Sequence, residues 1–147
     1  YALDEKYRKD YGDLTIIYGN RDSGEVLYTQ LLEEWEKRGD VNVVLTIDRP
    51  EENWIRKVGF VAAIVKEVAP SPDNAVAVIC GPPIMIKTAV AELVQLGWKD
   101  EQILGSYEKR MACGIGKCGR CNIGSKYVCI DGPVFSLAEM KKMAPES

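Results

Sequence analysis

Residues 75–83 read AVAVICGPP, a continuous apolar run that ends in a glycine and two prolines. A run rich in β-branched residues, without alternation, is typical of a strand that is covered on both faces of a sheet. Proline is favoured at the first position of a helix, so the two prolines predict a helix directly after the strand. A strand that leads straight into a helix is the building unit of a parallel α/β sheet.

Further strands are predicted on either side of this stretch. Residues 14–18 (LTIIY) and 41–47 (VNVVLTI) are apolar runs of the same kind, and residues 102–106 (QILGS) form a shorter one. The alternation of strands and helices predicts the α/β fold class, as a parallel sheet with helices on both faces. Between the runs, apolar residues recur at helical spacing over residues 27–35, 60–68 and 86–94.

The carboxyl ends of the strands are where such sheets bind ligands, so candidate nucleotide contacts follow the three longer runs. Gly81 would let a flat ring lie against the backbone, and a helix N-terminus offers N–H groups to phosphates or carbonyls. Taken alone, each group also fits an ordinary solvated loop or turn. The candidates are Tyr18, Gly19, Asn20 and Arg21 after the first run, Asp48 after the second, and Cys80, Gly81, Pro82 and Pro83 after the third.

Four of the five cysteines lie close together near the C-terminus. Cys113, Cys118 and Cys121 have the spacing C-x4-C-x2-C, and Cys129 follows after seven further residues. This is the spacing of plant-type [2Fe–2S] sites. The intervening glycines allow the backbone to wrap a cluster, and their N–H groups can donate to its sulfurs. The last ligand is expected to return on a hairpin, with a short strand over residues 126–130.

Other interpretations of the cysteines stay open. A structural zinc site usually pairs two C-x2-C knuckles, and here there is one. A pair of disulfides, or a redox-sensing thiol, are weaker alternatives. With the cluster interpretation, residues 1–110 form a nucleotide-binding domain and residues 111–147 form a cluster module, in which a capping box at Ser136 and Glu139 predicts a last short helix.

Composition narrows the function classes. The net charge of −3 argues against nucleic acid as a partner. The absence of histidine excludes catalytic triads and histidine-ligated metal sites. No apolar run approaches the roughly 18 residues of a membrane helix, and the charged start lacks an export signal, so we expect a cytoplasmic protein. Because the chain starts with Tyr1 rather than Met, we interpret it as part of a longer protein.

Taken in order, the motifs resemble one family. The family comprises ferredoxin-reductase-like electron-transfer subunits, which include the gamma subunit of sulfhydrogenases, the electron-transfer subunit of dihydroorotate dehydrogenase, the B subunit of anaerobic sulfite reductase and the small subunit of NADH-dependent ferredoxin:NADP oxidoreductase. The resembling segments are Tyr18-Gly-Asn-Arg21, Asp48 with Trp54 and Val58-Gly-Phe-Val61, Cys80-Gly-Pro-Pro-Ile-Met85, and the cysteine-rich tail that continues as Cys129-Ile-Asp-Gly-Pro-Val-Phe135.

The resemblance implies an FAD-binding barrel, then an NAD(P)-binding domain, then a small [2Fe–2S] module. It also implies that Cys80, as the catalytic residue, and Gly81 lie near the nicotinamide and the flavin, and that Met85 belongs to this site. The four clustered cysteines would hold the cluster. The family's first strand at the sheet centre is missing here. We therefore expect FAD and NAD(P) to bind the full-length protein and the isolated chain to be inactive. We also expect its sheet to be completed by formation of a homodimer or by exchange between chains.

We therefore expect an electron-transfer subunit of a hydrogenase-type oxidoreductase, which passes electrons between NAD(P)H, FAD and a [2Fe–2S] cluster to a partner subunit. The alternatives are an electron-transfer subunit of dihydroorotate dehydrogenase or of ferredoxin:NADP oxidoreductase, and a non-catalytic, zinc-stabilised binding module. Cysteine at position 113 favours the hydrogenase or dihydroorotate type. Arg21 and Arg49 would accept a 2′-phosphate and Asp48 would repel one, so the sequence leaves NAD and NADP open.

Overall fold

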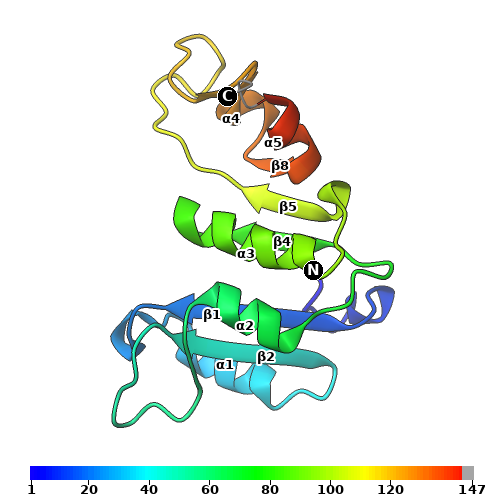
Figure 1. Cartoon of the computed structure of the whole chain (residues 1–147), viewed down its shortest axis with the longest axis vertical. Coiled ribbons are helices and arrows are strands. Elements are labelled where there is room, and N and C mark those ends of the chain that lie inside the picture. Colours follow the sequence, from blue (N-terminus) through cyan, green and yellow to red (C-terminus); the bar gives the residue numbers. More distant parts are fainter. Residues whose placement is uncertain (144–147) are drawn as a thin grey trace. The chain divides into compact units, whose positions relative to one another are not determined.

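The chain folds into two compact units, Tyr1–Pro70 and the residues from Ser71 onward. The structure is a computed structural model that describes residues 1–143. The predicted α/β fold class is confirmed, because parallel strands alternate with helices along the chain (Figure 1). Each unit has a sheet of its own, and the candidate site residues are divided between the two.

The first unit is built on a three-stranded parallel sheet in the order β1-β2-β3. Its strands are β1 (Leu14–Asn20), β2 (Val41–Ile47) and β3 (Lys57–Val58). Strand β1 pairs with β2 over its whole length, so that Asn20 lies opposite Ile47. The carboxyl ends of the two strands therefore meet at the same edge of the sheet. The short strand β3 was not predicted.

Two helices cover this sheet. Figure 1 shows α2 (Val61–Val68) in front of the strands and α1 (Thr29–Glu36) behind them, which agrees with the prediction of helices on both faces. Helix α2 lies close to β1 because position 19 is a glycine: a Cβ on Gly19 would lie 2.5 Å from the Cγ2 atom of Val61. The core of this unit consists of buried apolar side chains, namely Leu32, Val41, Leu45, Ile47, Ile64 and Val65.

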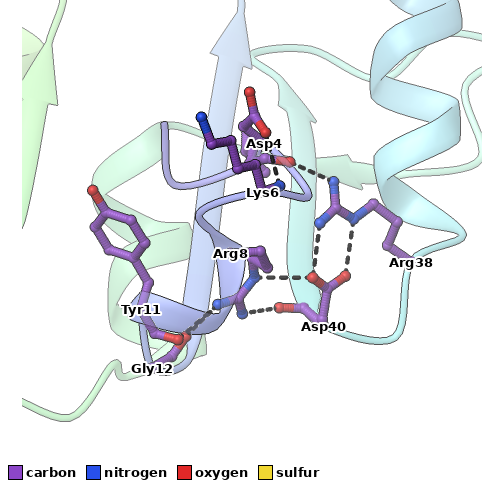
Figure 2. Close-up of polar contacts among 8 residues, drawn as sticks. Asp4, Lys6, Arg8, Tyr11, Gly12, Arg38 and Asp40 are labelled. Carbon is purple, nitrogen blue, oxygen red and sulfur yellow. Dashed lines mark hydrogen bonds and ion pairs between the residues drawn. The ribbon is translucent and has the colours of Figure 1, made fainter.

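Two arginines around Asp40 tie the segment before β1 to the loop before β2 (Figure 2). The Nη1 group of Arg8 donates to the carbonyls of Tyr11 and Gly12, at 2.9 Å each, and its Nε lies 2.9 Å from the Asp40 carboxylate. Arg38 donates to both oxygens of the same carboxylate, at 2.9 and 2.7 Å. The N-terminal segment is thereby held at the amino ends of the strands.

The second unit has a mixed sheet in the order β4-β5-β8. Strands β4 (Ala77–Cys80) and β5 (Ile103–Ser106) are parallel, as predicted, and β8 (Val134–Ser136) is antiparallel to β5 and was not predicted. Helix α3 (Pro83–Gln95) follows β4 as predicted, with Pro82 as its N-cap and Pro83 as its first residue. The core of this part consists of Ile79, Ile86, Ala89, Leu93, Trp98 and Ile103.

The cysteine-rich segment continues the second unit. A hairpin of β6 (Asn122–Ile123) and β7 (Lys126–Tyr127) leads into a single helical turn, α4 (Val128–Asp131), and α5 (Leu137–Met143) ends the described part. The predicted strand over residues 126–130 is therefore wrong beyond Tyr127. The Asp131 carboxylate accepts from the Tyr127 N–H at 2.6 Å and so caps the helical turn that carries the last cysteine.

The fold of the second unit joins residues on both sides of position 110. Strand β8 pairs with β5, and Phe135 of β8 is buried with Cys121 and Val128 in one apolar cluster. The predicted boundary between residues 1–110 and residues 111–147 separates two sets of sequence motifs. As a boundary between domains it stays a prediction. Only one face of strand β4 is covered. Ile79, on one face, is buried, whereas Val78, on the other face, is 68% exposed.

Candidate cysteine centre and nucleotide-binding edges

Backbone N–H groups of the cysteine loop, which we define as residues 113–121, point at cysteine sulfurs. The Sγ of Cys113 accepts from the N–H of Ile115 at 3.5 Å and from that of Cys118 at 3.4 Å. The Sγ of Cys129, on α4, accepts from the N–H of Gly116 at 3.2 Å. Hydrogen bonds of this kind stabilise a negatively charged sulfur. The geometry of the loop therefore favours thiolates at these positions.

Gly116 is the point at which the loop and α4 come closest. Its φ angle is +73°, in the left-handed region that L side chains rarely adopt. A Cβ at this position would also lie 2.7 Å from the Cδ1 atom of Ile130, the neighbour of Cys129 on α4. Glycine is required here on both counts, and it lets Cys129 reach the loop.

The thiol of Cys113 interacts with that of Cys118, and the thiol of Cys129 interacts with those of Cys121 and Cys113. Hydrogen bonds from the N–H of Ile115, from Cys118 and from the N–H of Lys117 lower the pKa of Cys113 to about 6, so this thiol is largely ionised at neutral pH. A hydrogen bond with Cys121 and burial raise the pKa of Cys129.

The thiols do not form one closed set of ligands in the structure. Within residues 1–143, no group of three or more His, Cys, Asp or Glu side chains is close enough to hold one metal ion. The four predicted ligands therefore lie near one another without surrounding a single point. All five cysteines are free of disulfides in the described residues.

The strand-end candidates of the first unit lie together at one sheet edge. The N–H of Asp48 donates to the carbonyl of Asn20 at 3.0 Å, and the Tyr18 hydroxyl accepts from the N–H of Leu27 at 3.3 Å. The side-chain Nδ2 of Asn20 is buried and has no hydrogen-bond partner in the described part of the chain. A buried amide N–H without a hydrogen-bond partner destabilises the fold. Asn20 is therefore a candidate to donate a hydrogen bond to a bound ligand.

Arg21 lies at the same edge but is already paired. Its Nη2 lies 2.7 Å from Oε1 of Glu25, and its Nε donates to Oε2 at 3.4 Å. Glu25, which the sequence interpretation did not include, therefore competes with any phosphate for the guanidinium. The i, i+4 spacing of Arg21 and Glu25 is the signal that would have found it. The Glu51 carboxylate, also missed, accepts from the N–H and hydroxyl of Ser23 at 3.0 and 2.5 Å.

The remaining nucleotide candidates lie in the second unit, at the carboxyl end of β4. Cys80 is exposed and ends the strand, and Pro82 and Pro83 open α3. A Cβ on Gly81 would lie 2.4 Å from the Cε atom of Met85, so the Met85 side chain lies over Gly81. These residues are brought together as the motif predicts, with Met85 as a flexible cover over the glycine.

Comparison with known proteins identifies the family to which the strand ends and the cysteine loop belong. Residues 2–91 match the model of the oxidoreductase NAD-binding domain, which covers both strand edges. The chain belongs to that family. Residues 108–141 match the iron–sulfur cluster binding domain of dihydroorotate dehydrogenase B, and this match contains all four clustered cysteines. The resemblance drawn from the motifs is thereby confirmed.

Two curated relatives of this NAD-binding family member are named as subunits of redox enzymes. The chain is 36% identical over 143 residues to sulfhydrogenase 1 subunit gamma of Pyrococcus furiosus, covering 92% of this chain and 48% of that one. It is 35% identical over 135 residues to a probable dihydroorotate dehydrogenase B electron-transfer subunit of Thermococcus kodakarensis, covering 92% of this chain and 52% of the relative. The chain spans about half the length of these relatives.

A solved structure supports the fold. The NADH-dependent reduced ferredoxin-NADP oxidoreductase matches with a TM-score of 0.64 and 20% identity, over 92% of this chain and 49% of the other. At this identity the match shows the fold alone. No helix in residues 1–143 is both long enough and apolar enough to cross a membrane.

Proposed function

We propose that the protein is an electron-transfer subunit of an NAD(P)H-linked, hydrogenase-type oxidoreductase. In this proposal Cys113, Cys118, Cys121 and Cys129 hold a [2Fe–2S] cluster. The observation that carries it is the cysteine loop, in which three backbone N–H groups already donate to the sulfurs of Cys113 and Cys129. An NAD-binding domain on the same chain supplies the link to pyridine nucleotide.

The donor set fits an iron–sulfur cluster. Four thiols are soft ligands of the kind that iron–sulfur clusters use, and these four side chains would hold the cluster. When bound, the cluster would accept and release one electron at a time. The N–H groups of Ile115, Gly116 and Cys118 would stabilise the extra negative charge on the sulfurs in the reduced state.

The nucleotide edges are assigned separately. We propose that Tyr18, Gly19, Asn20, Arg21 and Asp48 contact the adenosine part of NAD(P). In the same proposal Cys80, Gly81, Pro82, Pro83 and Met85 lie at the nicotinamide and the flavin of the full-length protein, with Cys80 touching the reacting ring. The unpartnered amide of Asn20 and the exposed thiol of Cys80 support these assignments. Cytoplasmic localisation and a homodimer of the isolated chain stay predictions.

Anaerobic reconstitution with iron and sulfide tests the cluster. The loaded chain should be red-brown, contain acid-labile sulfide, and give an EPR signal after reduction with dithionite. Cys118→Ser and Cys121→Ser should lose or alter the signal, whereas Cys80→Ser, which changes a cysteine outside the loop, should retain it. A colourless product that contains one zinc ion and no labile sulfide would instead support the zinc-stabilised module and end the electron-transfer proposal.

A second candidate is the electron-transfer subunit of dihydroorotate dehydrogenase or of ferredoxin:NADP oxidoreductase. The dihydroorotate type is favoured by the match of residues 108–141 to the iron–sulfur domain of dihydroorotate dehydrogenase B. The full-length protein, purified with its associated subunits, separates these candidates. Hydrogen-dependent reduction of NAD(P) would support the hydrogenase type, and dihydroorotate-dependent reduction of NAD would support the dihydroorotate type.

A further inference from the structure

The turn that follows strand β1 holds its hydrogen-bond donors against carboxylates. The guanidinium of Arg21 contacts the Glu25 carboxylate through its Nη2, at 2.7 Å, and through its Nε, at 3.4 Å. The N–H of Ser23 donates to Oε1 of Glu51 at 3.0 Å, and the Ser23 hydroxyl donates to Oε2 at 2.5 Å. The N–H of Glu25 donates to the Asp22 carboxylate at 3.1 Å. We call residues 21–25 together with Glu51 the acidic turn.

The donors of the acidic turn are the kinds of group that bind phosphate. Proteins bind phosphate through arginine guanidiniums, hydroxyl groups and backbone N–H groups. Here the guanidinium of Arg21, the hydroxyl of Ser23 and two backbone N–H groups already have carboxylate partners. Hydrogen bonds from Ser23 lower the pKa of Glu51, so this carboxylate is charged at neutral pH. A phosphate would reach these donors only by displacing a carboxylate that has the same sign of charge.

The surroundings of the Arg21 guanidinium are negatively charged. The hydrogen bond and the charge of Glu25 raise the pKa of Arg21, and Asp22 and Asp48 add smaller effects in the same direction. Both aspartates therefore lie near the guanidinium, at the same edge of the sheet. Arg49, which follows Asp48, is exposed and has no ion pair within residues 1–143. The carboxylates at this edge still outnumber the guanidiniums, since Asp22, Glu25, Asp48 and Glu51 face only Arg21 and Arg49.

Two observations other than these charges indicate a dinucleotide at this edge. Residues 2–91 match the oxidoreductase NAD-binding domain, and the buried Nδ2 of Asn20, the residue before Arg21, has no hydrogen-bond partner in the described part of the chain. In dinucleotide-binding sheets, a carboxylate accepts a hydrogen bond from the 2′-hydroxyl of the adenosine ribose of NAD, whereas an arginine accommodates the 2′-phosphate of NADP. Arg21 and Glu25 are one group of each kind, and here they bind each other.

We propose that the acidic turn makes the protein select NAD(H) over NADP(H). The inference rests on the proposed function, because it takes the edge after β1 as the site of the adenosine. The Glu25 carboxylate would accept a hydrogen bond from a ribose hydroxyl, which is a neutral donor, while it holds the guanidinium of Arg21 away from a 2′-phosphate. The charged 2′-phosphate of NADP would lie among like charges, whereas NAD carries no charge at that position.

Isothermal titration calorimetry on the full-length protein, with NAD⁺ and NADP⁺ as the two ligands, tests the proposal. Glu25→Gln keeps the size of the side chain, removes its charge and so releases Arg21. Glu51→Gln releases the donors of Ser23 in the same way. Arg21→Gln, added to Glu25→Gln, removes the released guanidinium. The matched control is Glu34→Gln, which makes the same change in charge at an exposed position on α1.

The unmodified protein should bind NAD⁺ at least about tenfold more tightly than NADP⁺, because like charges brought together are strongly unfavourable. Glu25→Gln should raise the affinity for NADP⁺ at least about fivefold, the added Arg21→Gln should remove this gain, and Glu34→Gln should leave the ratio of the two affinities within about twofold. Equal affinity for the two nucleotides, or an unchanged ratio in both Glu25→Gln and Glu51→Gln, would overturn the proposal. Binding of neither nucleotide would overturn it together with the assigned nucleotide site. The EPR signal of the cluster in the same samples reports on the electron-transfer proposal separately.

Discussion

The backbone N–H of Gly116 donates to the Sγ of Cys129 at 3.2 Å, which joins the cysteine loop to the helical turn that follows the hairpin. The two residues belong to different local structures, and the contact is their point of attachment. Since Gly116 also packs against Ile130, the last cysteine is positioned by both a hydrogen bond and a steric fit. Changes at Gly116 should therefore act on the whole centre.

Gly116→Ala should lower both the stability and the cluster occupancy of the loaded chain. The left-handed backbone costs an alanine about 1–2 kcal/mol, and the collision with Ile130 should add about 1–3 kcal/mol of overpacking. Gly114→Ala is the matched control, because Gly114 has a similar φ of +71° and no heavy atom within 4 Å of its Cβ position. Urea unfolding and iron content measure both effects. Equal losses in the two variants would show that the fit against Ile130 is unimportant.

Asp40 should make the first unit sensitive to acid. The Arg38 guanidinium, with a smaller effect from Arg8, lowers the pKa of the Asp40 carboxyl from 3.8 to about 2. A carboxyl whose pKa is lower in the folded chain stabilises the fold while it is ionised. Its contribution is therefore fully present above about pH 4 and is lost as the pH falls to about 2.

Asp40→Asn should remove that part of the acid sensitivity. Thermal unfolding from pH 5 down to about pH 2 should show a shallower loss of stability in the variant than in the unmodified chain. Asp13→Asn is the control, because Asp13 is exposed and has no ion pair in the described residues. Identical pH profiles for the Asp40 variant and the unmodified chain would contradict the assigned role of the two arginines.

Ser136 should be needed for the last helix of the described part. Its hydroxyl accepts from the N–H of Glu139 at 3.2 Å, and the Glu139 carboxylate accepts from the Ser136 N–H at 2.9 Å. Loss of a helix cap costs about 1 kcal/mol, so Ser136→Ala should destabilise the second unit by about this amount. Ser125→Ala, at an exposed position in the hairpin turn, should change stability by less than about 0.5 kcal/mol. Chemical denaturation of both variants provides the comparison.

The elements predicted from the sequence are those with local causes. The apolar run at β2, the two prolines at the start of α3 and the capping box at Ser136 all use residues near one another in the chain, and each is found in the structure. Strand β8 pairs with β5 from a distant part of the chain. Nothing in the residues of β8 alone indicates that partner, so tertiary packing decided it.

The candidate site also contains features that local sequence predicts and features that depend on tertiary contacts. The spacing of Cys113, Cys118 and Cys121 brings their thiols to one loop, which local sequence can predict. The helical turn at Cys129 depends on the Asp131 cap and on contact with the loop, so the predicted strand was wrong there. The salt bridge of Arg21 with Glu25 has a sequence signal in its i, i+4 spacing, and the structure confirms that the two side chains meet.

Val76 and Val78 should limit the solubility of the isolated chain. They are 62% and 68% exposed, and β4 is an edge strand of its sheet within the described residues. An apolar face on an open strand edge favours association with other chains. Val76→Thr with Val78→Thr should therefore reduce concentration-dependent association, measured by light scattering, and change the free energy of unfolding by less than about 0.5 kcal/mol, because neither side chain is buried. Ile79→Ala is the contrasting change: Ile79, the residue after Val78, is buried, so its truncation should cost about 2–5 kcal/mol. If the double threonine variant is as destabilised as Ile79→Ala, then this face is covered within the monomer and the open edge is not the cause of association.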